Sequence, residues 1–180
     1  MACTRYSTSI TTACRNAQPG IAKIYLANYV DLLSYTVDTA GTSITGFTMS
    51  GSTYFYPVAL NKQVGSLVDT PTINVANGVA VSKPKVAFKV QGLSTDTIAM
   101  YKSLLQADVV AVVKTINGDY FGVGFANGLS MSTGTLGSEA AVDGFIGFTA
   151  ELDGIESSPF YKLTADAITD LTTYVSGGVL

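Results

Sequence analysis

Short runs of apolar and β-branched residues, separated by turns rich in Gly, Asn and Asp, recur along most of this chain. This pattern is typical of a mainly β protein. Pro57 marks its run as an edge strand or a bulge, and period two in residues 44–49 places Ile44 and Phe47 on opposite faces. We predict strands at residues 21–29, 32–37, 44–49, 53–60, 64–75, 79–91, 107–116, 120–125 and 138–152.

One helix is predicted at residues 94–106. Ser94 can accept a hydrogen bond from a free N–H group of the first turn, and Asp96 suits the positive end of the helix dipole. Spacings of three and four place four apolar residues on one face: Ile98, Tyr101, Leu104 and Leu105.

A tight hairpin is predicted to follow this helix. Residues 107–116 are rich in Val and are expected to form a central strand that is buried on both faces. The pair Asn117-Gly118 favours a type I′ turn, after which residues 120–125 return antiparallel. We expect the helix to cover one face of this hairpin.

The other segments complete the expected architecture. Residues 1–20 are predicted to form an extended arm, and residues 21–180 a single β-rich domain. Asn77-Gly78 predicts a second hairpin, and residues 126–137 are expected to be a loop. Residues 138–152 are expected to form a strand largely buried on both faces. A short helix at residues 165–174 would be capped by Thr164.

The composition indicates self-association. Hydrophobic residues make up 47% of the chain and charged residues only 13%, about half of the usual ~25%. The mean hydropathy is +0.35. Because a surface with so few charges is hard to keep in water, we expect part of it to be covered in a homo-oligomer.

The charge and the termini exclude other classes. The net charge of −3 and the absence of a basic cluster disfavour a dedicated nucleic-acid-binding protein. We expect no membrane span and no signal peptide, and therefore folding in the cytoplasm. Cys3 and Cys14 are expected to remain free thiols rather than bind zinc.

No convincing catalytic or cofactor motif is present. The chain has no His, which removes the commonest general base. Residues 122–128 have the wrong spacing for a dinucleotide loop, and Ser82-Lys83-Pro84-Lys85 lacks the companion motifs of a Ser-x-x-Lys nucleophile. Three carboxylates are expected to lie in a solvated turn rather than bind calcium: Glu151, Asp153 and Glu156. We expect no catalytic residue, metal or cofactor.

Several segments, read together, resemble the tail tube proteins of tailed bacteriophages, particularly of phages that infect Bacteroidetes. The similarity begins with Met1-Ala2-Cys3, Cys14-Arg15 and residues 19–26 and is clearest over residues 93–152. It continues through Ser158-Pro159-Phe160, whereas residues 31–60 match no pattern of the family.

The resemblance implies an antiparallel β-sandwich or barrel-like subunit with a flanking helix and no enzymatic activity. Such subunits form hexameric rings whose sheets join into one inner barrel, and the rings stack into a virion tail tube through which DNA passes. The implied partners are further copies, other tail proteins and double-stranded DNA bound without specificity. We expect the arm and residues 44–60 to make contacts between subunits, with six candidate residues: Tyr6, Ile10, Phe47, Tyr54, Phe55 and Tyr56.

Two interpretations of the run Tyr54-Phe55-Tyr56 stay open at this point. It could be a contact patch, or it could be ordinary packing. The alternative function is a carbohydrate- or surface-binding β-sandwich module, in which these three rings would form a platform for stacking on a sugar.

Overall fold

The computed structural model describes residues 18–60, 64–74, 76–139 and 144–177. Its strands are β1 (Ile21–Asn28), β2 (Leu32–Val37), β3 (Ser43–Met49), β4 (Tyr56–Ala59), β5 (Ser66–Asp69), β6 (Thr72–Asn74), β7 (Val79–Val81), β8 (Pro84–Gln91), β9 (Val109–Thr115), β10 (Tyr120–Val123), β11 (Ser130–Ser138), β12 (Ile146–Asp153) and β13 (Tyr161–Leu163). The helices are α1 (Thr95–Leu104), α2 (Ala165–Tyr174) and the short 3₁₀ helix η1 (Tyr29–Asp31). The predicted arm lies almost wholly outside the described residues.

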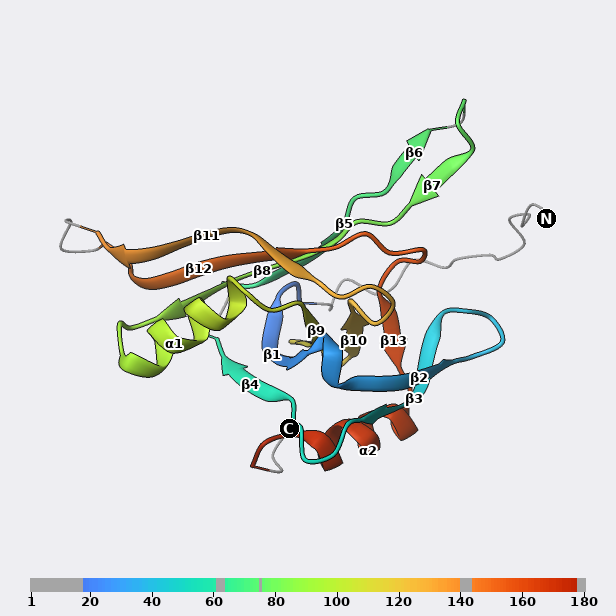
Figure 1. The fold of residues 1–180 in the computed structure, drawn as a ribbon, viewed down its shortest axis with the longest axis horizontal. Helices are drawn as coiled ribbons and strands as arrows, with labels where there is room; N and C mark the ends of the chain where they lie inside the picture. The colour runs from blue at the N-terminus through green and yellow to red at the C-terminus, as the bar shows by residue number, and fades with distance from the viewer. Residues whose placement is uncertain (1–17, 61–63, 75, 140–143, 178–180) are drawn as a thin grey trace.

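Two sheets form the body of the protein (Figure 1). The larger has the strand order β2-β3-β13-β10-β9-β1-β4, and the smaller has the order β11-β12-β8-β5. The pairings are antiparallel except for β13 with β3. A separate two-stranded ribbon, β6-β7, projects from the body. The predicted mainly β fold with flanking helices is confirmed.

The hydrophobic core has two parts, which lie on opposite faces of the seven-stranded sheet. Ala111 and Val113 of β9 pack with Phe148 of β12 between the sheets, whereas Val110 and Val112 pack with Leu171 of α2. All five residues from Val109 to Val113 are buried. The prediction of a central strand buried on both faces is confirmed.

The β9–β10 hairpin is also confirmed, but the predicted turn type is wrong. Thr115 N–H donates to the carbonyl of Asp119 (2.8 Å), and Gly118 N–H donates to the carbonyl of Thr115 (3.0 Å). The central pair of the turn is therefore Ile116-Asn117, and Gly118, at φ +93°, follows it. A three-residue loop of this kind needs a left-handed residue only at its last position.

Helix α1 has the predicted cap but covers a different surface. Ser94 Oγ accepts from Thr97 N–H, and Ser94 N–H donates to Thr97 Oγ1, each at 3.2 Å. The helix packs on β11 and β12 rather than on the β9–β10 hairpin, with the ring of Tyr101 5.5 Å from that of Phe148.

The predicted apolar face of α1 is only partly buried. Leu104 is buried and Tyr101 half-buried, whereas Ile98 and Leu105 are exposed. The helix packs against the core at the end of the small sheet through a strip formed by Met100, Tyr101 and Leu104. The buried strip is therefore narrower than the apolar face that the spacing of these residues predicted. No helix in the described ranges is long and apolar enough to cross a membrane.

The predicted face assignment in β3 is wrong. Ile44 and Phe47 are both buried in the cluster beneath α2. The pairing with β2 shifts register between Thr36 and Val37. Because this bulge inserts one residue, two positions of opposite parity point to the same side.

The region after β10 differs most from expectation. Residues 130–137 of the predicted loop form, together with Ser138, the edge strand β11. Thr133 and Thr135 supply β-branched side chains, and the neighbouring strand β12 supplies backbone partners. The predicted strand 138–152 is in fact β12, which begins at Ile146, and residues 140–143 lie outside the described part. Only one face of β12 is buried, through Phe148, Ala150 and Leu152.

The C-terminal helix is confirmed at its predicted bounds. Thr164 Oγ1 accepts from the N–H of Ala167 at 3.4 Å, so the predicted cap is present. Ala167 and Leu171 face the seven-stranded sheet and are fully buried. Strand β2 and the β6–β7 hairpin around Asn77-Gly78 also lie where predicted.

Candidate assembly surfaces

Among the described residues, strand β11 forms a long free edge of the four-stranded sheet. Its nine residues include no charge and no proline, and seven of them are exposed, all but Met131 and Gly134. Edge strands usually carry lysine, proline or a short length to prevent pairing with another chain. Because β11 has none of these, its backbone can pair with a strand of a neighbouring molecule.

The opposite edge of the same sheet is β5. This strand has four residues, exposes Val68 and pairs, within the part of the chain that the structure describes, with β8 on one side only. The two edges are different surfaces, so pairing β11 of one copy with β5 of the next would be a head-to-tail contact. Repeating that contact gives a ring or a filament.

The β4 edge of the seven-stranded sheet is protected, in contrast. Pro57, which has no N–H group, lies opposite Tyr25. The backbone of Phe55 donates to Tyr174 (2.7 Å) and accepts from Ser176 (3.0 Å). The prediction that Pro57 marks an edge strand is confirmed, and the residues after α2 cover part of that edge.

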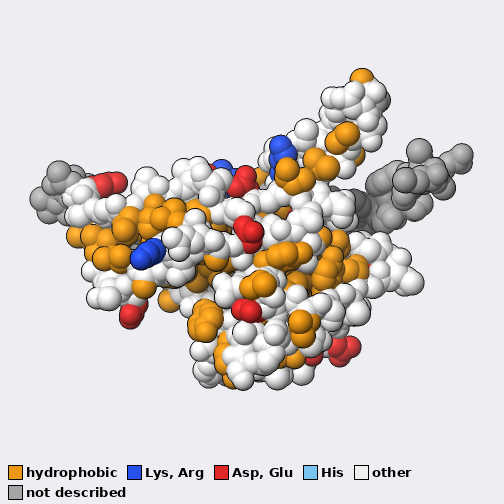
Figure 2. Space-filling model, in the orientation of Figure 1, with side chains coloured by type: hydrophobic (Ala, Val, Ile, Leu, Met, Phe, Trp, Pro, Cys, Tyr) orange, Lys and Arg blue, Asp and Glu red, His pale blue; other side chains and the backbone are white. Residues whose placement is uncertain are grey.

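An apolar surface lies at the end of the small sheet, beside α1. Leu136 lies opposite Phe148 on the inner face, and it is 38% exposed, while Ile146 is 46% exposed. Ile98 and Leu105 of α1 are exposed as well. Figure 2 shows hydrophobic side chains gathered over this end of the molecule with few charged ones among them. We call Ile98, Leu105, Leu136 and Ile146 the apolar end.

The outer face of the small sheet is polar and balanced in charge. Alternation along β8 and β12 places Lys85 and Lys89 beside Glu151 and Asp153 on this face. Lys85 Nζ lies 2.5 Å from Glu151 Oε2. Thr149 lies directly opposite Lys89. Among the described residues of these two strands, two positive and two negative side chains leave this face with no net charge.

The predicted contact residues fall into three groups. Tyr6 and Ile10 lie outside the described residues. Tyr54 and Tyr56 are 41% and 58% exposed. Phe47 and Phe55, at 5% and 0%, belong to the core beneath α2 and contact each other edge to face at 5.6 Å. The platform of three adjacent aromatic rings is therefore reduced to two exposed tyrosines.

A further exposed apolar site lies at β2, the other edge of the seven-stranded sheet. Val30, in η1, is 82% exposed, and Leu33 is exposed as well. The sequence did not predict the exposure of either residue, because an isolated apolar residue in a short amphipathic run can be either buried or exposed. This edge is a second candidate contact surface.

Glu156 does not lie in a solvated turn, and that prediction is wrong. Its side chain is buried, and its two carboxylate oxygens accept from the N–H groups of Ala126 (3.3 Å) and Asn127 (3.2 Å). Burial raises the pKa of Glu156, although the two hydrogen bonds oppose the shift. Since Glu151 pairs with Lys85 instead, these carboxylates serve separate local contacts.

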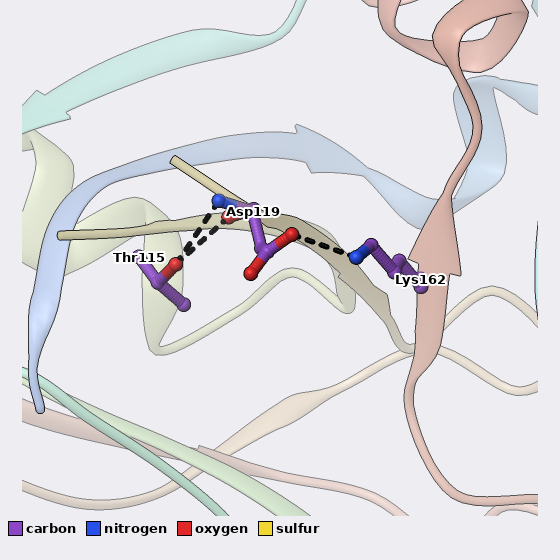
Figure 3. Close-up of polar contacts among 3 residues, drawn as sticks. All are labelled: Thr115, Asp119 and Lys162. Atoms are coloured by element: carbon purple, nitrogen blue, oxygen red, sulfur yellow. Dashed lines mark hydrogen bonds and ion pairs between the residues drawn. The ribbon is translucent and has the colours of Figure 1, made fainter. Parts of the chain in front are cut away.

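The remaining polar groups singled out in the sequence also have structural partners. Ser82 is buried and donates to Asp69 Oδ1 at 2.6 Å. Figure 3 shows Asp119 bonded to Thr115 within the hairpin and to Lys162 of β13, with 2.7 Å between Lys162 Nζ and Asp119 Oδ1. Both members of this ion pair are about half exposed, so its contribution to stability is small.

A groove of about 840 Å³ opens where residues 18–20 enter the fold. Its apolar lining comes from both sheets and their connections: Pro19, Ile21, Leu67, Ile116, Phe121 and Phe160. No ionisable side chain is among its described lining residues. The groove therefore offers contact area but no acid or base.

No family model, curated protein or solved structure matches this chain. The function is therefore inferred from the sequence resemblance and from the surfaces above. Sequence reasoning missed the β11 edge, because its Gly, Ser and Thr residues are typical of a loop. The alternation of Thr133 and Thr135 ahead of a second strand was the available signal.

Proposed function

We propose that this chain is a structural subunit of a bacteriophage tail tube. It would fold in the host cytoplasm, assemble into stacked hexameric rings and form, in the virion tail, a conduit for DNA ejection. Its partners would be further copies, other tail proteins and passing double-stranded DNA. The observation that carries the proposal is the four-stranded sheet with a free edge at each end, β11 and β5.

The shape of this sheet favours continuation into a neighbour. An exposed edge of uncharged residues is a template for backbone pairing, and β11 is such an edge over nine residues. The apolar end lies beside it. A neighbour that pairs with β11 would also remove Leu136 and Ile146 from water, at roughly 25 cal/mol per Å² of apolar area.

The outer face of the sheet suits the lumen of such a tube. If sheets join in a ring with α1 outside, this face would meet the DNA. Lys85 and Lys89 are balanced by Glu151 and Asp153, so there is no excess of cations to hold phosphates. Duplex DNA could then move past without specific binding.

Electron microscopy of the concentrated, purified protein tests the proposal, which expects rings or tubes. Thr133→Lys places a charge on the exposed β11 edge and should reduce assembly at least tenfold without changing the fold. Thr172→Lys is the matched control, because Thr172 is exposed on α2, away from both free edges. The control should assemble like the unmodified protein.

A monodisperse monomer at high concentration would contradict the proposal, as would equal assembly of the two variants. The alternative binding module makes a different prediction. It expects glycan binding by the monomer that Tyr54→Ala and Tyr56→Ala abolish. A glycan array with both variants therefore separates the two functions.

A further inference from the structure

Two lysines and two tyrosines lie together on the α2 side of the seven-stranded sheet. Lys23 and Tyr25 are on β1, Lys114 is on β9 and Tyr120 is on β10. Lys114 lies directly opposite both Lys23 and Tyr120 in the two strand pairings. We call these four residues the lysine–tyrosine cluster.

The two lysines leave the sheet from adjacent positions and carry the same charge. Lys23 lies directly opposite Lys114, and directly opposed side chains in an antiparallel sheet have Cβ atoms about 5 Å apart. Lys23 Nζ is 5.6 Å from the ring centre of Tyr25, and Lys114 Nζ is 5.1 Å from that of Tyr120. The tyrosine rings thus restrict where the ammonium groups can lie.

The cluster contains hydrogen-bond donors without a matching acceptor. Within the described ranges, ion pairs join Lys85 to Glu151 and Lys162 to Asp119, and the two cluster lysines take part in neither. The hydroxyl of Tyr25 is buried and has no hydrogen-bond partner among the described residues. Burial and the neighbouring Tyr120 raise the pKa of Tyr25 to about 12, so the hydroxyl keeps its proton.

Opposed cations on one sheet face destabilise the folded chain unless an anion lies between them. Both lysines are only partly exposed, which strengthens their interaction with such an anion relative to fully solvated side chains. Lysine binds carboxylate and phosphate groups as a compact point charge with three donors.

We propose that the lysine–tyrosine cluster is an oxyanion-binding site, with Lys23 and Lys114 as its two binding residues. The ligand is a carboxylate or phosphate group. It could come from a free anion or from an Asp or Glu side chain of a second copy of this chain. The site does not depend on the proposed tail-tube function.

Calorimetric titration of the dilute protein with inorganic phosphate, and separately with acetate, tests the site at low ionic strength. We expect saturable binding that the double variant Lys23→Gln/Lys114→Gln weakens by about tenfold or more, since charge-assisted hydrogen bonds are lost. The control is Lys83→Gln/Lys102→Gln, which removes the same charge from two exposed lysines. Thermal melting of each variant verifies that it is folded.

A second measurement identifies the source of the oxyanion. Sedimentation of the concentrated proteins compares self-association of the double variant and its control. Loss of phosphate binding with unchanged association supports a free anion as ligand. Weaker association of the double variant alone supports a carboxylate from a second copy. If the double variant and the control match in both measurements, the proposal is overturned, whether or not tubes form.

Discussion

The backbones of Ser82 and Glu156 exchange two hydrogen bonds of 2.9 Å, N–H of each to the carbonyl of the other. This bridge joins the β7–β8 connection to the segment before β13. It also places the Glu156 carboxylate beside the turn at Ala126 and Asn127. The carboxylate accepts hydrogen bonds from the N–H groups of both residues. The buried charge is therefore held by backbone donors alone among its described hydrogen bonds.

The stability of the protein should depend on pH through Glu156. Because burial raises its pKa in the folded state, the folded chain binds the proton more tightly than the unfolded chain. The contribution of Glu156 to the free energy of unfolding is then fully present below the ordinary carboxyl pKa and is lost as the pH rises through the raised pKa.

Glu156→Gln should remove this pH dependence. Urea unfolding of both proteins at several pH values gives the difference in free energy of unfolding between them, in which the other carboxylates cancel. As the pH rises through the raised pKa of Glu156, the unmodified protein should lose free energy of unfolding relative to the variant. A difference that is constant with pH would show that the Glu156 pKa is the same in the folded and unfolded states.

Phe55 and Tyr56 are neighbours with opposite roles. Phe55→Ala should lower the free energy of unfolding by about 3–5 kcal/mol, because it leaves a cavity in the core beneath α2. Tyr56→Ala, at an exposed position, should change it by about 1 kcal/mol or less. Chemical denaturation measures both, and similar losses would contradict the assignment of Phe55 alone to the core.

The cap of α1 predicts another pair of variants. Ser94→Ala removes the acceptor for Thr97 N–H and should cost about 0.5–2 kcal/mol. Ser103→Ala removes a hydrogen bond from the Ser103 hydroxyl to the carbonyl of Ala99 in the same helix. Because that carbonyl lies in the helix interior, where it can accept a backbone hydrogen bond, the free energy of unfolding should fall by about 0.5 kcal/mol or less. Equal effects on the melting temperature would exclude a capping role for Ser94.

Gly124 should tolerate a side chain far less than Gly41. Both have positive φ, +78° and +71°, so alanine strains either backbone by about 1–2 kcal/mol. A Cβ on Gly124 would also lie 2.7 Å from Leu129 Cγ, whereas Gly41 has open space. Denaturation should show a larger loss for Gly124→Ala. Equal losses would mean that the core near Leu129 relaxes freely.

Local signals predicted the elements whose structure is decided locally. Thr164 caps α2 and fixes its start, and the Val-rich run of β9 has too many β-branched residues for a helix. Because five consecutive residues of β9 are apolar, both faces of this strand were expected to be buried. The sequence was therefore sufficient for these elements and for the mainly β class.

Other features depend on partners that are distant in sequence. The bulge that turns Ile44 and Phe47 to one side arises in the pairing with β2, and β11 becomes a strand because β12 supplies its backbone partners. Exposure is equally non-local. Phe55 and Tyr56 are adjacent aromatic residues that point to opposite sides, and Phe55 is the buried one because it packs in the core beneath α2 and bridges to Val175. For the same reason, the sequence did not indicate the lysine–tyrosine cluster.

The β6–β7 ribbon differs from the rest of the fold in how it can open. Neither hydrophobic cluster includes any of its residues, and an isolated two-stranded hairpin is at best marginally stable in water. Its backbone bonds can therefore break while the clusters stay intact, unlike those of β9. Amide hydrogens should exchange rapidly in the ribbon and only through global unfolding in β9, so the chain has two separate levels of stability.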